Sequence, residues 1–196
     1  MTNRVLILAS QSPRRRQLLE EASYDFQVVP PSAGAECGAC SGESPDQFVA
    51  RQAEQKARDV AAQLQQQPQT RTIVGCDTVA ECDGRILGKP TDEDHAREML
   101  QLLRGREHRV LSGLCVLWEP EEVSKTSTVV TRLTMKELTD HEIDDYLDSD
   151  LWVGKAGGFG LQDRTGWIQI VEGSYSNVVG LPLEYLQIVL QQGPHT

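Results

Sequence analysis

The chain has 196 residues, of which 39% are hydrophobic, and a formal net charge of −10 at pH 7. This length allows one globular domain with a sizeable core. The acidic balance argues against a protein that binds nucleic acid or an anionic membrane, since either partner requires broad basic surfaces. A phosphate site in such a chain must be a local basic pocket, which suits a small nucleotide better than a polymer.

Hydrophobic patterning predicts alternating strands and helices in the first half of the chain. A buried strand at residues 4–9 precedes a helix at 13–22, a short strand at 26–29 and a loop at 30–43. A long helix at 45–65 leads to a strand at 72–82, and the Asp83–Gly84 turn predicts a hairpin with residues 85–87.

Longer β-type runs dominate the second half. Thr91 is expected to cap a helix at 92–103, and the runs at 107–118 and 124–135 are expected to pair. Thr139 and Glu142 form a capping box for a helix that ends near residue 147. A glycine-rich stretch at 154–160 precedes a strand at 167–171, and Pro182 opens the last helix. Together the elements predict an α/β fold with a mixed, twisted sheet flanked by helices.

The start of the first predicted helix carries an unusual set of charges. Ser12 is a good N-cap and Pro13 suits the first helical position, but Arg14, Arg15 and Arg16 follow in the first turn. A helix N-terminus is electropositive, so each cation there costs about 0.3–1 kcal/mol. A bound anion would offset this cost, and the turn therefore predicts a phosphate ligand.

Helical spacing separates the three arginines. Arg14 and Arg15 lie four residues before two leucines, so they share the core-facing side of the helix. Arg16 lies four residues before Glu20, an ordinary solvent-side partner. We expect the first two to face a ligand; a solvated basic turn is the alternative.

Three more charged residues suit phosphate chemistry. Asp77 is predicted to lie at the end of a buried strand, where a carboxylate is costly unless it binds a metal or positions water. Lys89 is held extended by Pro90 at the exit of the hairpin, which would bring it back near Asp77. Lys56 shares a helix face with alanines and either snorkels to solvent or reaches into a cleft. A turn-capping Asp77 and an ordinary surface Lys89 remain alternatives.

Three further positions have weaker signals. Glu36 is an isolated carboxylate in the predicted loop, where it could help to bind a divalent ion. Lys155 and Gln162 flank the glycine-rich stretch, and the Gln162 amide offers both a donor and an acceptor to a base edge. A hairpin with a polar residue is the alternative. The chain has no GxGxxG and no GxxxxGK[ST] motif, which disfavours the common nucleotide folds.

The five cysteines, an odd number, favour free thiols in a reducing cytoplasm. The apolar run at residues 5–9 is too short for a signal peptide or a membrane span, so a cytoplasmic location is expected. Cys37 and Cys40 form a CxxC pair without a second pair at zinc-finger spacing. Loop cysteines are favoured over a metal or redox site, which remains an alternative.

Several of these segments together resemble the Maf family, the nucleoside triphosphate pyrophosphatases once described as septum-formation inhibitors. The resemblance rests on six stretches: residues 8–15, 53–57, 75–79, 83–90, 155–162 and 173–183. It implies one Maf-like domain over residues 1–196, with two lobes around a central cleft and a fold similar to inosine triphosphate pyrophosphatase. Members of the family are often homodimers.

The resemblance also implies a reaction and the residues that perform it. The reaction is cleavage between the α- and β-phosphates, with Mg²⁺ or Mn²⁺, to give a nucleoside monophosphate and pyrophosphate. Asp77 would be the general base and, with Glu36, would hold the metal. The residues implied to hold the triphosphate are Ser10, Arg14, Arg15, Lys56 and Lys89.

Substrate choice follows from three positions of the same resemblance. Arg14, Thr78 and Gln162 look like the branch that acts on dTTP and UTP. Asp163 departs from the family pattern, in which Gly usually follows the Gln, and Val153-Gly154 stands where an acidic residue often precedes the Lys155 position. The alternatives are specificity for methylated GTP, or a nucleotide-binding regulator of cell division that does not turn over its ligand.

Overall fold

The computed structural model describes residues 4–35, 37–38, 40–66, 69–163 and 165–195. The chain divides into two compact units. Unit 1 comprises Met1–Asp77, Ser112–Val129 and Gly180–Thr196, and unit 2 comprises Thr78–Leu111 and Val130–Val179. No helix in the described part of the chain is both long and apolar enough to cross a membrane.

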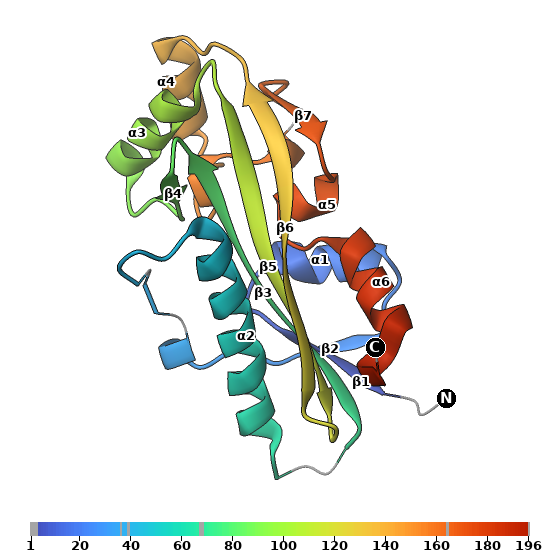
Figure 1. Cartoon of the computed structure of the whole chain (residues 1–196). Coiled ribbons are helices and arrows are strands. Elements are labelled where there is room, and N and C mark those ends of the chain that lie inside the picture. The colour runs from blue at the N-terminus through green and yellow to red at the C-terminus, as the bar shows by residue number, and fades with distance from the viewer. Residues whose placement is uncertain (1–3, 36, 39, 67–68, 164, 196) are drawn as a thin grey trace. The chain divides into compact units, whose positions relative to one another are not determined.

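The strands form one mixed sheet with the order β2-β1-β3-β5-β6-β7, and β4 pairs with β3 (Figure 1). Strand β1 is parallel to both β2 and β3, whereas β4 is antiparallel to β3 and β7 is antiparallel to β6. The predicted mixed α/β fold is therefore confirmed. The strands are β1 Val5–Ala9, β2 Phe26–Val28, β3 Arg71–Cys82, β4 Arg85–Leu87, β5 Glu107–Glu119, β6 Val123–Met135 and β7 Ile168–Glu172.

The helices follow the predicted order, with two differences. Asp92, not Thr91, caps α3, because its Oδ1 accepts a hydrogen bond from the backbone N–H of His95 at 2.8 Å. A short helix, α5, was not predicted. The helices are α1 Pro13–Glu21, α2 Pro45–Leu64, α3 Glu93–Leu103, α4 Asp140–Asp148, α5 Tyr175–Val179 and α6 Leu183–Gln192; 3₁₀ turns are η1 Ala33–Ala35, η2 Ala156–Gly158, η3 Leu161–Asp163 and η4 Gly193–His195.

Two glycines let α2 contact the sheet backbone directly in unit 1. A Cβ added at Gly75 of β3 would lie 2.2 Å from the carbonyl oxygen of Ala53, and one at Gly113 of β5 would lie 1.9 Å from that of Val49. Real side chains cannot approach so closely, so only glycine fits at either position. This packing fixes α2 along the sheet and places Lys56, three residues after Ala53, beside the segment that follows Gly75.

Unit 2 has its own apolar core beneath α3 and α4, which lie near one another in Figure 1. Leu100 and Leu103 of α3 and Ile143 and Leu147 of α4 are almost fully buried there. The same core includes Phe159 at the end of the glycine-rich segment. That segment is thus anchored to the core by apolar burial.

Candidate functional site

The N-terminus of α1 holds Arg15 in a defined position. The Ser12 hydroxyl caps the helix by accepting a hydrogen bond from the Arg15 N–H at 3.5 Å. Arg15 Nε donates to the carbonyl oxygen of Gly180 at 2.7 Å, and its Nη1 donates to the Ser10 hydroxyl at 3.2 Å. The Ser10 hydroxyl also accepts from the Ser12 N–H at 3.1 Å. Ser10 and Arg15, two predicted site residues, are therefore in direct contact.

The other two arginines differ as the helical spacing predicts. Arg16 lies on the exposed side and pairs with Glu20, with Nε 2.8 Å from Oε1. Arg14 is half-buried. The face that carries Arg14 and Arg15 is thus distinct from the solvent face that carries Arg16.

Lys56 and Asp77 form a largely buried ion pair in unit 1. Lys56 Nζ lies 2.6 Å from Asp77 Oδ1, and the two side chains keep only 5% and 17% of their exposure. Lys56 does not snorkel, because the close packing of α2 turns it toward β3. The prediction that Asp77 ends a strand is wrong: it lies in the middle of β3, where Asp77 and Thr78 are two half-buried positions in an otherwise buried strand.

Lys89 lies outside the hydrogen-bonded ladder of the hairpin in unit 2. The register of β3 with β4 ends at Ala80 opposite Leu87, and Lys89 is exposed. The carbonyl oxygen of Gly88, the preceding residue, accepts a hydrogen bond from Gly157 N–H at 2.9 Å. The chain that carries Lys89 is therefore attached to the glycine-rich segment. Its predicted approach to Asp77 stays a prediction.

Gln162 lies in the turn η3, beside a buried charge network. The Asp163 carboxylate, with 4% exposure, accepts from Lys155 Nζ through Oδ1 and from the Tyr146 hydroxyl through Oδ2, the latter at 2.6 Å. Tyr146 lies on the buried face of α4, and its ring centroid is 5.0 Å from that of Trp167. Sequence reasoning missed Tyr146, whose only signal is its place on the apolar side of that helix.

The predicted metal ligand Glu36 lies outside the described residues. Within the described ranges, no cluster of three or more His, Cys, Asp or Glu side chains suitable for a metal ion is present. Cys37 and Cys40 are free and exposed, and the Cys37 sulfur lies 2.9 Å from Nη1 of Arg51. Arg51 is paired to Glu43, whose carboxylate also accepts from the Cys40 N–H at 3.0 Å.

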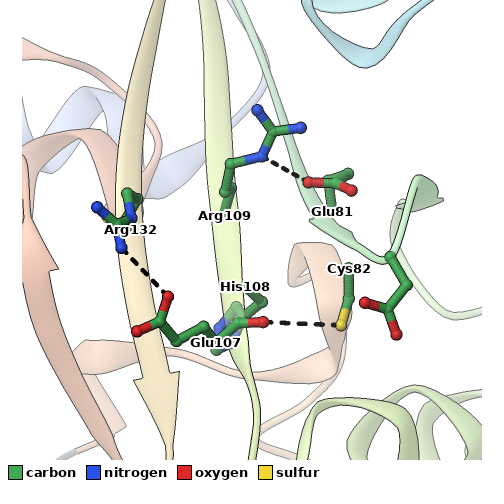
Figure 2. A pocket seen from close by; sticks show the side chains of 7 residues that line it. Glu81, Cys82, Glu107, His108, Arg109 and Arg132 are labelled. Atoms are coloured by element: carbon green, nitrogen blue, oxygen red, sulfur yellow. Dashed lines mark hydrogen bonds and ion pairs between the residues drawn. The ribbon is translucent and has the colours of Figure 1, made fainter.

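A separate pocket of about 220 Å³ in unit 2 contains none of the predicted site residues (Figure 2). Its charges are matched: Arg109 pairs with Glu81 at 2.6 Å and Arg132 pairs with Glu107 at 3.2 Å. Burial lowers the pKa of His108, which also lines the pocket, to about 4. The charges of these two ion pairs therefore compensate each other within the lining.

Comparison with known proteins identifies the family. Residues 5–193 match the family model described as Maf-like protein. The chain is 49% identical over 187 residues to a dTTP/UTP pyrophosphatase of Rhodopirellula baltica, covering 95% of this chain and 81% of the relative. It is 40% identical over 183 residues to a dTTP/UTP pyrophosphatase of Thermococcus gammatolerans, covering 93% of each chain.

Among solved structures, the chain is similar to a nucleoside-triphosphatase / dITP/XTP pyrophosphatase of Mycobacterium abscessus. The TM-score is 0.38 at 15% identity, and the match covers 66% of this chain and 72% of the other. This likeness is partial, so the assignment rests on the sequence matches, which span nearly the whole chain. On those matches, the chain belongs to the Maf-like protein family.

Proposed function

We propose that this protein is a nucleoside triphosphate pyrophosphatase, a hydrolase that cleaves between the α- and β-phosphates and releases a nucleoside monophosphate and pyrophosphate. Its membership of the Maf-like family and the activity for which its relatives are named support this proposal. The observation that carries it is the ion pair between Lys56 of α2 and Asp77 of β3, whose Nζ and Oδ1 atoms lie 2.6 Å apart. Asp77 occupies one of the two half-buried positions of an otherwise buried strand.

Asp77 is assigned the role of general base. It accepts the proton of the water that attacks the phosphoryl group, and the phosphoanhydride oxygen leaves with the pyrophosphate. Phosphoryl transfer requires little covalent work from the protein, so most of the catalysis comes from positioning and from compensation of negative charge. Asp77 therefore needs cationic groups to act with it.

The groups proposed to hold the triphosphate are cations and one hydroxyl. Arg15 is oriented in advance by Gly180 and Ser10, which lowers the entropic cost of binding phosphate with a planar guanidinium. Lys56 is fixed by its pair with Asp77, whereas Lys89 is exposed and free to adapt to its ligand. The full set is Ser10, Arg14, Arg15, Lys56 and Lys89.

A divalent cation, Mg²⁺ or Mn²⁺, is proposed as the cofactor. Mg²⁺ usually binds one or two carboxylates, with phosphate oxygens and waters as its remaining ligands, so the Asp77 carboxylate fits this mode of binding. Asp77 would hold the ion, with Glu36 as the second proposed ligand. When bound, the ion supplies positive charge against the phosphates.

The proposed substrates are dTTP, UTP or modified pyrimidine nucleotides, and the proposed role is removal of unwanted nucleotides from the cellular pool. The relatives at 40–49% identity are named for dTTP and UTP, which favours these substrates over methylated GTP. Arg14, Thr78 and Gln162 are the proposed specificity residues. Gln162 offers an amide donor and acceptor, the pair of groups that a pyrimidine edge requires.

The test is pyrophosphate release from a panel of normal and modified triphosphates with Mg²⁺ or Mn²⁺. We expect release from dTTP and UTP, and a loss of roughly 10²–10⁴-fold in kcat for Asp77→Asn. The matched control is Asp148→Asn, an exposed carboxylate at the end of α4 that should leave activity unchanged. Nucleotide binding without any release would instead favour a non-catalytic regulator of cell division.

Three further expectations accompany this function: a single domain with two lobes around a central cleft, a homodimer, and a cytoplasmic location. Light scattering would measure the mass in solution. A value near 21.7 kDa, the mass of one chain, would contradict the homodimer.

A further inference from the structure

The backbone carbonyl oxygen of Gly180 accepts hydrogen bonds from two side chains of unit 1. Arg15 Nε donates to it at 2.7 Å, and the thiol of Cys76 donates to it at 3.3 Å. The Cys76 side chain has no exposure to solvent. A fully buried thiol therefore shares one acceptor with the arginine that is proposed to bind phosphate.

The alternation of side chains along β3 explains how Cys76 reaches this carbonyl. Successive side chains of a strand point to opposite faces of the sheet. Gly75 and Asp77 face α2, since the first packs against the helix backbone and the second pairs with Lys56. Cys76, between them, points to the other face. Strand β1 ends opposite Gly75, so the segment that leads from β1 to α1 starts beside Cys76.

The carbonyl of Gly180 depends on such donors for its direction. Gly180 has a φ of +126°, a backbone conformation that glycine adopts readily and other residues rarely adopt. Because glycine has no Cβ, local sterics leave the adjoining peptide groups free to rotate. A carbonyl oxygen has two lone pairs, and donors from two separate elements, β3 and α1, fix its direction here.

Arg15 is held at two points of its guanidinium group. Besides the bond from Nε, its Nη1 donates to the Ser10 hydroxyl at 3.2 Å. Ser10 is itself buried and accepts from the Ser12 N–H at 3.1 Å, so this second point is firmly placed. Two points define the plane of the guanidinium, whereas one would let it turn. The plane matters because a guanidinium binds phosphate through parallel N–H bonds.

We propose that Cys76 is a positioning residue for phosphate binding, which orients the Arg15 guanidinium through the carbonyl of Gly180. This inference rests on the proposed function, in which Arg15 binds the triphosphate. The guanidinium is ordered before the ligand arrives, so less conformational entropy is lost on binding and the affinity is higher. A thiol is a weak donor, so the expected contribution is modest, about three- to fivefold in affinity.

The experiment compares the wild type with Cys76→Ala, which removes the thiol donor. For the triphosphate that the wild type hydrolyses best, KM should rise about three- to fivefold while kcat stays within about twofold. The affinity for inorganic pyrophosphate with Mg²⁺, measured by calorimetry, should fall by the same factor. A residue that only stabilised the fold would lower the fraction of active protein, and thus the apparent kcat, and would leave KM and the affinity unchanged.

Two matched variants separate the hydrogen bond from the packing. Cys76→Ser replaces the thiol with a hydroxyl that can also donate, so it should restore KM to within about twofold of the wild type. Cys115→Ala is the control, because Cys115 of β5 is equally buried in unit 1 and its thiol is hydrogen-bonded to the Thr126 side chain. This variant should keep the wild-type KM and pyrophosphate affinity.

A double-mutant cycle tests whether Cys76 acts through Arg15. In an Arg15→Ala background, Cys76→Ala should have no further effect on kcat/KM, because the group that it orients is gone. The same three- to fivefold loss in that background as in the wild type, about a factor that multiplies the loss from Arg15→Ala, would contradict the proposal.

The outcomes distinguish this inference from the proposed function. No pyrophosphate release from any triphosphate overturns the proposed function, and no binding of pyrophosphate as well overturns this inference with it. An active wild type for which Cys76→Ala and Cys115→Ala have the same KM and the same pyrophosphate affinity overturns only the role of Cys76. If Cys76→Ala does not fold, Cys76→Val, which also lacks a donor but fills the space, replaces it in every comparison.

Discussion

Lys56 Nζ lies 2.6 Å from Asp77 Oδ1, although the two residues are 21 positions apart and belong to different elements, α2 and β3. The contact depends on Gly75, where the absence of a side chain lets α2 approach β3 so closely. Both side chains are mostly withdrawn from water, so each charge relies on the other. The pair thus links the packing of the fold to the proposed chemistry.

Lys56→Met should destabilise the protein because it leaves the Asp77 carboxylate largely buried without its cation. We expect a loss of about 2–3 kcal/mol in the free energy of unfolding, less than for a fully buried pair because Asp77 keeps some exposure. The double variant Lys56→Met/Asp77→Asn should regain at least about 1 kcal/mol of that loss. Urea unfolding measures both, and strictly additive effects of the two changes would contradict the coupling.

The three arginines of α1 should differ in their effect on turnover. Arg14→Ala and Arg15→Ala should each lower kcat/KM by roughly 10²-fold, because they remove a cation proposed to bind phosphate. Arg16→Ala should change it by less than about twofold, since Arg16 is exposed and pairs with Glu20. The assay is pyrophosphate release, and equal losses for all three would show that the proposed ligand face of α1 is wrong.

Gly75→Ala should be strongly destabilising. The added methyl group would collide with the backbone of α2 at Ala53, which cannot move without displacing the helix, so we expect a loss of about 3 kcal/mol or more. Gly34→Ala is the matched control, because a Cβ there meets nothing within 4 Å. Its effect on thermal or urea unfolding should stay within about 0.5 kcal/mol. A tolerated Gly75→Ala would mean that α2 does not pack this closely in solution.

His108 should make the protein sensitive to acid. Burial is the main cause that lowers its pKa to about 4, from an ordinary value near 6.5, so the folded state resists protonation while the unfolded state accepts it. The unfolded state therefore binds more protons between these two values, and stability falls as the pH drops from about 6.5 toward 4. The loss in the free energy of unfolding is about 2–3 kcal/mol near the lower end of this pH window.

Urea unfolding at neutral pH and at about pH 4.5 tests this prediction. In His108→Gln, the part of the acid-induced loss in the free energy of unfolding that this residue causes should disappear. His141→Gln is the control, because the His141 side chain keeps 84% of its exposure. If the free energy of unfolding fell by the same amount in acid for His108→Gln and for the wild type, the buried, neutral state of His108 would be contradicted.

Thiol labelling should divide the five cysteines into two classes. Cys37 and Cys40 are exposed and should react quickly in the native protein, whereas Cys76, Cys82 and Cys115 are buried and should react only after unfolding. Burial also raises the pKa of Cys115 to about 11, so this side chain stays in the thiol form, which reacts poorly with alkylating reagents. Mass spectrometry after brief alkylation would identify the labelled residues, and the double variant Cys37→Ser/Cys40→Ser should retain pyrophosphate release. Loss of activity in that variant would revive a metal or redox role for the pair.

The sequence by itself determined most of the helices and strands, α5 excepted, and which side chains share a face of the first helix. Capping residues such as Ser12 and Thr139 act on their own helix, so a local sequence pattern predicts them correctly. The same holds for the pairing of Arg16 with Glu20, because helical periodicity places residues four apart on one face. The error at Thr91 shows the limit of this logic, since Asp92 competes for the same cap and accepts from His95.

Only the tertiary structure decided which distant charges meet. Snorkelling and burial of Lys56 are equally compatible with its helix, and the choice depends on the contact of α2 with Gly75. The partners of Asp163, Lys155 and Tyr146, come from separate segments that the burial of α4 and the glycine-rich stretch brings together. Such contacts arise from packing across the chain, which local propensity does not encode. The sequence identified the chemical groups, and the packing determined their arrangement.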